Sequence, residues 1–570
     1  MSQKISKIKI SHAIKRTIII IVSLIAIIFL IKIAPNYVKE AKIEETKLII
    51  NNNNVTNTLK SKLKIKDDTI YLSEEDIKNF FDEYIVEENN KIITTSNTKT
   101  VAIPKDINQG KMYINGSYIE IKNPIIVENN TTYIPISDLN EVYNYEINYQ
   151  DKTNTVIIDS LNRKKVEAIA SKKLNVKYKT TFLSKTIETI ERGETVTILQ
   201  SQNENKSIEK NGWVRIRTQS GNMGYVKKSD LLNENVVREN LEEEKIAGKV
   251  SLAWDYYNMY TVAPSRTEKI GGINIVSPSF YELKSDGTLV SNIGNSGEKY
   301  IEWAHSNNYK IWPTISNSML NNLDAVSKMM SNFEYRANLI DNIVKALSET
   351  DVDGINIDFE NMYKEDKDKY SRFIIELAPR LAEIGKKICV DVTAPDGSDT
   401  WSLCYDRNTI GKVADYIVFI GYDEHTASSK EAGTVAGADW QELNIKKFLG
   451  QEGIDSKKVI LAMPFYTRLW TQQNGRVSSK VVNMNKVEIP SGVTKKWDEN
   501  TKQNYIEYTS KVNGNDVTYK MWIEDEDSIA VKLDLVNTYN LAGAGFWELG
   551  RENSEVWNIA KDKLKVETTN

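Results

Sequence analysis

The sequence predicts a multidomain chain whose C-terminal part folds as a parallel (β/α)8 barrel. At 570 residues with 40% hydrophobic content, the chain is too long for one ordinary core, and about two to four domains are expected. An apolar run beside lysines opens the chain, and short strand-like runs follow it. From residue 247 to residue 568 the pattern changes to buried strands that alternate with amphipathic helices, which is typical of a parallel barrel.

Residues 1–36 predict a basic cytoplasmic tail and a transmembrane helix. The apolar run Thr17–Ile31 follows several lysines, and with Ile33 and Ala34 it approaches the roughly 20 residues that a bilayer requires. The basic flank places the remainder of a single-pass protein outside the cytoplasm. Secretion after cleavage of a signal peptide is the alternative, but no small-x-small site follows the run. Residues 37–60 then predict a polar tether.

Residues 61–160 predict a small α+β module. Within Tyr113–Asp159 the sequence predicts a hairpin, then NNTTYIPISDL leading into a short helix, then a last hairpin turned by QDKTN. This segment resembles the N-terminal module of copper amine oxidases, and the resemblance implies a spacer or a wall-adhesion module. No copper is expected, because residues 13–304 contain neither His nor Cys.

Residues 166–233 predict a small all-β barrel, because short alternating strands are separated by Gly and Asn turns. The ending GWVRIRTQSGNMGYV, Gly212–Val226, resembles bacterial SH3-like domains, and this implies a spacer or a domain that binds cell-wall peptide. Trp213 and Tyr225 are candidates for a ligand groove or for the core. A charged linker, residues 234–246, separates this domain from the last block.

Eight strand candidates, with helical patterns between most of them, support the barrel over residues 247–568. Apolar residues three and four apart predict helices within 325–349 and 368–385. The long stretch between the seventh and eighth strands, about residues 470–525, predicts an inserted α+β lobe. The strand candidates are 250–257, 273–283, 309–317, 352–360, 387–395, 415–425, 458–467 and 542–550.

The fourth strand candidate, VDGINIDFE, carries two carboxylates on one face. Side chains alternate along a strand, so every second residue from Gly354 faces the barrel axis, namely Gly354, Asn356, Asp358 and Glu360. Glu360 comes last, at the C-terminal mouth where barrel enzymes keep their chemistry. Neighbouring carboxylates in a partly desolvated mouth have raised pKa values, so a glutamate there can stay protonated and act as a general acid. A salt bridge to a basic side chain of the barrel is the alternative.

DGINIDFE (Asp353–Glu360) is similar to the DGxDxDxE signature of glycoside hydrolase family 18, the chitinase-like barrels. Further segments agree with that family, and the resemblance covers about residues 245–566. In its details the chain resembles the branch of bacterial spore and cell-wall N-acetylglucosaminidases. The agreeing segments are Gly421–His425, Met463–Trp470, Lys520–Ile529 and Gly543–Gly550.

The resemblance implies a substrate-assisted retaining mechanism, in which the acetamido oxygen of the sugar attacks its own anomeric carbon. It implies Glu360 as the general acid, Asp358 as the partner of the acetamido N–H, and Tyr422 as the donor to the acetamido oxygen. Candidate substrate-binding residues are Trp547, Asp423, Tyr466, Asn356 and Trp312, the last because it lies near a predicted strand end. Asn356 stands where the signature has its middle acid, so the inner member of the carboxylate relay is neutral.

Charge and composition exclude other classes of partner and site. Lys+Arg number 74 against 78 Asp+Glu, a formal charge of −4, so nucleic acid is a poor candidate partner. With 3 His and 2 Cys, a zinc site is nearly excluded, and no cofactor or metal is expected. Cys389 and Cys404 are expected as free core thiols, with one disulfide between them as the alternative. The sequence predicts no oligomeric state.

We therefore expect a membrane-anchored extracellular glycosidase that hydrolyses β-1,4 bonds in a polysaccharide containing N-acetylglucosamine. Peptidoglycan or spore cortex is the expected substrate, with chitin oligosaccharides as an alternative. A barrel that binds glycan without cutting it, as a cell-wall scaffold protein, is the alternative from a different class. Both exo and endo cleavage are compatible with the sequence.

Overall fold

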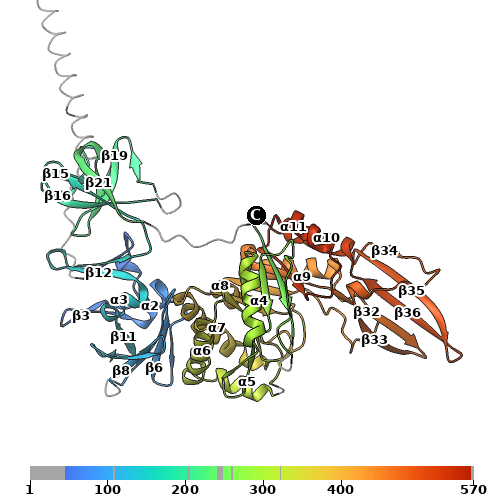
Figure 1. The fold of residues 1–570 in the computed structure, drawn as a ribbon. Helices are drawn as coiled ribbons and strands as arrows, with labels where there is room; N and C mark the ends of the chain where they lie inside the picture. The colour runs from blue at the N-terminus through green and yellow to red at the C-terminus, as the bar shows by residue number, and fades with distance from the viewer. Residues whose placement is uncertain are drawn as a thin grey trace, which may run out of the picture. The chain divides into compact units, whose positions relative to one another are not determined.

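A computed structural model describes residues 45–566 except 107–109, 202–205, 240–247, 258–260 and 321, and also the single residue Ser23. The chain forms two compact units. The described residues of the first lie within 1–83 and 122–243, and those of the second lie within 84–121 and 244–570 (Figure 1). Each unit has its own sheets and its own core, and each is described separately.

The second unit is built around a closed barrel of parallel strands. The third strand position is split into β26 and β27 at Trp312–Pro313, because proline has no N–H to donate to the ladder. β26 pairs with β23, β27 pairs with β28, and β37 closes the barrel between β31 and β22. All strand candidates from the sequence are thereby confirmed. The strands are β22 (Val250–Asp255), β23 (Ile275–Pro278), β26 (Lys310–Ile311), β27 (Thr314–Ser316), β28 (Gly354–Asp358), β29 (Lys387–Val392), β30 (Tyr416–Ile420), β31 (Val459–Pro464) and β37 (Gly543–Trp547).

Helices cover the outside of the barrel, and the largest apolar core lies between them and the strands. Four of the eight described helices have a capping side chain at the N-terminus: Asn332, for example, accepts from the N–H of Tyr335, and Asp525 forms a capping box with Ser528. Between β23 and the first helix of this unit, a hairpin of β24 (Tyr281–Leu283) and β25 (Leu289–Ser291) extends the sheet beside β27. The helices are α4 (Gly294–Ser306), α5 (Leu323–Met330), α6 (Phe333–Ser348), α7 (Lys367–Glu383), α8 (Arg407–Val413), α9 (Ala438–Gly450), α10 (Glu526–Thr538) and α11 (Val556–Leu564).

Much of the barrel interior is filled by a cluster of apolar side chains. Gly545 of β37 lies under the ring of Trp254, where a Cβ atom would come within 2.6 Å of that ring. Cys389 belongs to this interior cluster, and Cys404 belongs to the outer core. Both cysteines are buried free thiols, as predicted, so the alternative of a disulfide is not adopted.

The insertion between β31 and α10 is a five-stranded antiparallel sheet, ordered β33-β32-β36-β35-β34. The sequence predicted an α+β lobe here, and this is corrected: the insertion contains strands and one short 3-10 turn, Met484–Lys486. The Asn-Gly pairs at 474–475 and 513–514 adopt positive φ angles and turn two long hairpins. The strands are β32 (Tyr466–Gln473), β33 (Arg476–Asn483), β34 (Lys496–Asp498), β35 (Gln503–Val512) and β36 (Asn515–Ile523), which extend away from the barrel in Figure 1.

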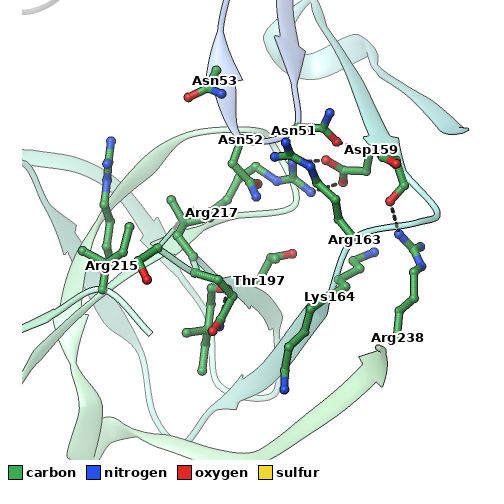
Figure 2. A pocket seen from close by; sticks show the side chains of 17 residues that line it. Asn51, Asn52, Asn53, Asp159, Arg163, Lys164, Thr197, Arg215, Arg217 and Arg238 are labelled. Atoms are coloured by element: carbon green, nitrogen blue, oxygen red, sulfur yellow. Dashed lines mark hydrogen bonds and ion pairs between the residues drawn. The ribbon is translucent and has the colours of Figure 1, made fainter. Parts of the chain in front are cut away.

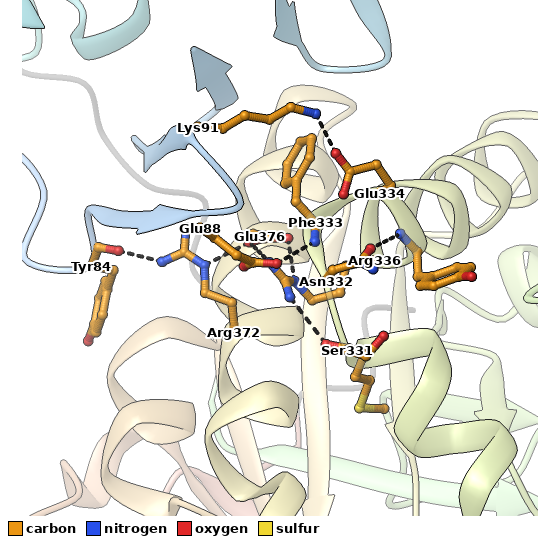
Figure 3. Close-up of polar contacts among 12 residues, drawn as sticks. Tyr84, Glu88, Lys91, Ser331, Asn332, Phe333, Glu334, Arg336, Arg372 and Glu376 are labelled. Atoms are coloured by element: carbon orange, nitrogen blue, oxygen red, sulfur yellow. Dashed lines mark hydrogen bonds and ion pairs between the residues drawn. The ribbon is translucent and has the colours of Figure 1, made fainter. Parts of the chain in front are cut away.

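Residues 84–121, which fall inside the predicted 61–160 module, belong to the same compact unit as the barrel. They form an antiparallel sheet against α6 and α7, and Ile93, Ala102 and Tyr113 pack with Phe333 and Ala337. Figure 3 shows the polar contacts of this interface. The strands are β5 (Val86–Glu88), β6 (Lys91–Thr95), β7 (Thr100–Pro104), β8 (Lys111–Ile114) and β9 (Ser117–Glu120).

Arg336 of α6 is the centre of that interface. Its guanidinium donates to both carboxylate oxygens of Glu376 at 2.9 Å and to Glu88 of β5 at 2.6 Å, and the arginine is only 2% exposed. Arg372 adds a bond to the backbone carbonyl of Tyr84. Lys91 pairs with Glu334 at the exposed edge. The β5–β9 sheet is therefore held to the barrel by a buried charge network as well as by apolar contacts.

The first unit begins with strands that the sequence assigned to the 37–60 tether. Leu48 is fully buried in β1, which pairs in parallel with β13, so this part of the prediction is corrected: an apolar triplet, Leu48–Ile50, enters a sheet. The elements are β1 (Lys47–Ile50), β2 (Asn53–Asn54), β3 (Lys64–Lys66), β4 (Thr69–Ser73), α2 (Glu74–Phe80), β10 (Ile126–Glu128), β11 (Thr131–Pro135), α3 (Asn140–Tyr143), β12 (Tyr145–Gln150) and β13 (Thr155–Ser160).

The rest of the first unit is an eight-stranded antiparallel sheet with a separate apolar core. Trp213 is buried against Phe182 and Lys227, whereas Tyr225 is half-buried. The predicted all-β character of residues 166–233 is therefore observed. The strands are β14 (Lys165–Ala170), β15 (Leu174–Lys177), β16 (Thr186–Ile190), β17 (Thr195–Ile198), β18 (Glu209–Lys210), β19 (Trp213–Arg217), β20 (Met223–Lys227) and β21 (Leu231–Arg238).

The predicted transmembrane span, Thr17–Ile31, lies outside the described residues apart from Ser23. Among the residues that the structure does describe, none of the helices is both long and apolar enough to cross a bilayer.

Candidate active site

Strand β28 presents its polar face to the barrel interior and its apolar face to the helices. Ile357 and Phe359 are fully buried in the outer core, and Phe359 stacks on Phe373 of α7 with ring centroids 5.8 Å apart. The alternation predicted from VDGINIDFE is thus observed. Asp358 is the last residue of the strand, and Glu360 lies two residues further along the chain. Both side chains are half-buried.

Glu360 is fixed through its backbone by the neighbouring strand position. Its N–H donates to Asn317 Oδ1 at 2.9 Å, and Asn317 Nδ2 donates in return to the Glu360 carbonyl at 2.8 Å. Asn317 follows β27 and is buried. The two reciprocal bonds fix the position of the Glu360 backbone at the mouth.

Burial and neighbouring acids set the protonation of the two carboxyls. Burial, and next the charges of Asp358 and Asp423, hold the pKa of Glu360 well above its usual range. Burial raises the pKa of Asp358 from 3.8 to about 6. Within the described residues no Lys or Arg forms an ion pair with either carboxyl, so the salt-bridge alternative finds no partner there.

A third acid, Asp391 of β29, lies beneath this pair and was missed by sequence reasoning. Asn356 Nδ2 donates to Asp391 Oδ2 at 2.7 Å, and both side chains are buried. Burial and the charge of Asp358 hold the pKa of Asp391 well above its usual range. The signal in the sequence was a carboxylate inside an otherwise apolar strand, CVDV, next to the strand that carries Asn356.

The mouth also contains Tyr422, Asp423 and Tyr466, which follow strands β30 and β31. Tyr466, at the start of β32, donates its hydroxyl to Asp423 Oδ1 at 2.6 Å. The rings of Tyr422 and Tyr466 meet edge to face with centroids 6.3 Å apart. Burial, then Tyr466 and Asp358, hold the pKa of the Tyr422 hydroxyl well above its usual range, so it stays a hydrogen-bond donor.

Trp547, the last residue of β37, forms an aromatic wall with two residues of the first barrel strand and the loop after it. Its ring centroid lies 6.0 Å from that of Trp254 and 5.8 Å from that of Tyr256. Trp547 is half-buried and Tyr256 is 48% exposed, so this wall has an open face. An aromatic face of this kind suits the apolar face of a sugar ring.

Trp312 does not line the mouth, and its predicted role in sugar binding is corrected. Its side chain is 1% exposed and packs on Tyr416, with ring centroids 5.3 Å apart. It lies against Gly354, the first residue of β28, whereas the mouth is formed at the other end of that strand. The ring points into the barrel interior, where it belongs to the same apolar cluster as Ile275 and Cys389.

Glu282 of β24 is a second acid that sequence reasoning missed. It is 4% exposed, and burial raises its pKa from 4.5 to about 7, with a further contribution from Asp358. Ser318 Oγ donates to it at 3.4 Å. The described part of the chain holds no group of three or more His, Cys, Asp or Glu side chains arranged to hold a metal ion. The raised pKa values of Glu282, Asp358 and Glu360 make the mouth an acid cluster suited to proton transfer.

A family model, Glycosyl hydrolases family 18, matches residues 253–552, which include every one of these mouth residues. The chain belongs to glycosyl hydrolases family 18. The resemblance stated from DGINIDFE is confirmed, and this family 18 chain is a glycosyl hydrolase. A second model, Copper amine oxidase N-terminal domain, matches residues 49–158, which confirms that resemblance as well.

Curated relatives of this family 18 enzyme include a glycosylase and a cortical fragment-lytic enzyme. The uncharacterized glycosylase YvbX of Bacillus subtilis is 28% identical over 303 residues, which are 51% of this chain and 85% of YvbX. The cortical fragment-lytic enzyme of the same organism is 21% identical over 297 residues, 50% of this chain and 67% of that enzyme.

Among solved structures, a chitinase from Chromobacterium violaceum matches with a TM-score of 0.47 and 22% identity, covering 55% of this chain and 99% of that one. The spore cortex-lytic enzyme SleL of Bacillus megaterium matches with a TM-score of 0.46 and 20% identity, covering 59% and 79%.

Proposed function

We propose that this family 18 enzyme hydrolyses the β-1,4 bond after N-acetylglucosamine in peptidoglycan, either of the wall or of spore cortex. The observation that carries the proposal is the Glu360 carboxyl, whose pKa is held high among acids and which has no basic partner among the described residues. A protonated acid at a barrel mouth can donate to a departing glycosidic oxygen. The name of one relative, the cortical fragment-lytic enzyme, supports a cortex glycan as the substrate.

In the proposed reaction the sugar supplies its own nucleophile. The acetamido oxygen attacks the anomeric carbon while Glu360 protonates the leaving oxygen, so the glycosidic bond breaks as an oxazolinium ring forms. Asp358 accepts the acetamido N–H and offsets the positive charge, and the Tyr422 hydroxyl donates to the acetamido oxygen. Water then attacks the anomeric carbon, and the Glu360 carboxylate takes its proton, which restores the enzyme.

Asp391 takes the place of the acid that the family signature has at Asn356. Its carboxyl is joined to Asn356 at 2.7 Å, and its raised pKa is due in part to the charge of Asp358. Two coupled acids share protons as a pair rather than singly. Asp391 is therefore proposed as a positioning residue that takes up the proton when Asp358 must be charged opposite the oxazolinium.

The membrane location belongs to the same proposal. Thr17–Ile31, preceded by lysines, supports an anchor with the catalytic unit outside the cytoplasm. The full chain should fractionate with membranes, and a chain that begins at residue 45 should not. Release of the full chain into the medium in a shortened form would instead indicate secretion after signal cleavage.

The decisive experiment is incubation of the purified chain with peptidoglycan and with spore cortex, followed by mass analysis of the released muropeptides. Glu360→Gln should lower turnover by roughly 10²–10⁴ because the general acid is lost. Glu365→Gln, which alters an exposed glutamate five residues along the chain, is the matched control and should leave turnover unchanged. A glycan without N-acetyl groups should not be cut.

Several outcomes would contradict the proposal. Equal turnover of the deacetylated glycan would reject the substrate-assisted step. Turnover confined to chitin oligosaccharides would reject peptidoglycan as the substrate. Binding of glycan without any release of reducing ends would indicate a scaffold protein rather than a glycosidase.

A further inference from the structure

A cavity of about 600 Å³ lies in the first unit, between the β1–β2 turn, the β13–β14 connection and the eight-stranded sheet (Figure 2). It belongs to a different unit from the catalytic mouth. Its lining contains six Lys or Arg residues and a single acid, although the whole chain carries a formal charge of −4. The basic lining residues are Arg163, Lys164, Lys165, Arg215, Arg217 and Arg238, and the acid is Asp159.

The single lining acid is already neutralised. Arg217 donates through both terminal nitrogens to Asp159, one bond measuring 2.8 Å, and the two residues are 4% and 8% exposed. A buried bidentate pair of this kind is rigid and leaves no free carboxylate in the cavity. It also joins β19 of the eight-stranded sheet to β13, so this side of the cavity is held in a fixed position.

Other lining cations are paired with acids that do not line the cavity. Lys165 and Arg238 both contact Glu146, at 2.8 and 3.2 Å, and Lys164 contacts Glu239 at 3.3 Å. Two cations are left over: within the described residues, neither Arg163 nor Arg215 forms an ion pair. The uncompensated positive charge of the cavity therefore resides on two guanidinium groups.

Two polar atoms at the same cavity also lack hydrogen-bond partners. Asn52 Oδ1 and Ser201 Oγ are buried, and neither has a partner among the described residues. A buried polar atom without a partner costs free energy, so such atoms indicate where a ligand completes the hydrogen bonding. Asn51, Asn53, Thr197 and Gln200 add further amide and hydroxyl groups to the lining.

We infer that this cavity binds an acidic sugar through its oxyanion, a carboxylate or a phosphate. Guanidinium groups bind such oxyanions through paired hydrogen bonds, and the amides and hydroxyls suit the ring hydroxyls. A volume of about 600 Å³ is typical of a pocket for a small ligand. The inference goes beyond the proposed glycosidase activity, because the acid-rich catalytic mouth repels the charge that this cavity attracts.

Three sugars that share one ring test the inference on the full chain. N-acetylglucosamine is neutral, N-acetylmuramic acid adds a carboxylate, and N-acetylglucosamine 6-phosphate adds a phosphate. Their binding is measured by titration calorimetry at low salt, with wild-type chain, with the Arg163→Gln/Arg215→Gln double variant, and with Arg192→Gln. Arg192 is an exposed arginine of the same unit that does not line the cavity, so its variant controls for the loss of a positive charge outside the cavity.

We expect at least one acidic sugar to bind about tenfold or more tightly than the neutral sugar, because a charge-assisted pair adds that much affinity. The double variant should lose this preference, and Arg192→Gln should keep it. A preference for the muramic acid alone identifies a carboxylate ligand, and a preference for the 6-phosphate alone identifies a phosphate ligand. Equal binding of all three sugars, or a preference that survives in the double variant, overturns the inference. Far-ultraviolet circular dichroism of each variant shows whether it is folded.

Discussion

At the scale of single residues, the mouth of the barrel is controlled by what surrounds each carboxyl. Glu360, Asp358, Asp391 and Glu282 all have raised pKa values, and burial is the first cause in every case. The charge of Asp358 adds to the shift of the other three. Acids that share a desolvated site cannot all ionise at neutral pH, so some of these four carboxyls stay protonated.

Exchange of the inner acid tests the role of Asp391. Asp391→Asn should lower kcat by about a hundredfold, the lower end of what a positioned proton-transfer group contributes, with a shifted pH profile and little change in KM. Adding Asn356→Asp to that variant returns a carboxyl to the pleat below Asp358 and should recover most of the lost kcat. Steady-state kinetics across pH measures both. An unchanged pH profile in Asp391→Asn would assign Asp391 a purely structural role.

Part of this site could be predicted from sequence and part could not. Period-two alternation within DGINIDFE is local, so it placed Asp358 and Glu360 on one face correctly. Asp391 and Glu282 come from other strands, and their approach to Asp358 depends on strand register, which no single segment encodes. Trp312 was misplaced for a similar reason: strand register sets its level along the barrel, beside Gly354 and away from the mouth.

At the scale of elements, the β5–β9 sheet is attached to α6 and α7 by a buried arginine. Arg336 satisfies Glu376 and Glu88 at once, and Glu376 also accepts from Arg372 at 2.7 Å. A buried ion network of this type favours one arrangement of the sheet on the helices, because any other arrangement leaves an unpaired charge in the core. The sequence did not predict this attachment, since the partners are more than two hundred residues apart.

Removal of the buried cation tests the contribution of this network. Arg336→Ala should lower the free energy of unfolding of the barrel unit by about 3–5 kcal/mol, because Glu376 is left in the core with one partner fewer. Lys91→Ala breaks the exposed pair with Glu334 at the same interface and should cost no more than about 1 kcal/mol. Urea unfolding followed by tryptophan fluorescence measures both. Equal losses of unfolding free energy in the two variants would contradict the prediction that the buried ion pairs contribute more than the exposed one.

At the scale of the whole molecule, stability of the barrel depends on pH through its stored protons. The folded pKa values of Glu282 and Asp358 lie at about 7 and about 6, above their ordinary values of 4.5 and 3.8. At pH values between the ordinary and the raised pKa values, the folded chain therefore binds more protons than the unfolded chain. Their stabilising contribution is complete below pH 4 and is lost as the pH rises through 6 and 7.

Thermal unfolding at several pH values tests this dependence. The melting temperature of the barrel unit should fall between pH 4.5 and pH 7.5. Glu282→Gln should flatten the fall, because an amide stays neutral at every pH. Glu298→Gln, which alters an exposed residue of α4, is the control and should leave the slope as it is. A melting temperature that rises over this range in wild type would contradict the assignment of buried protonated acids.

Residues 84–121 have a practical consequence for anyone who isolates the catalytic part. The family match begins at residue 253, which invites a recombinant fragment that starts near there. Such a fragment would lack the β5–β9 strands, so Phe333 and Ala337 would meet water and Arg336 would lose Glu88. Poor solubility of that fragment would then reflect a missing layer rather than an unstable enzyme, and co-expressing residues 84–121 as a separate peptide should restore it.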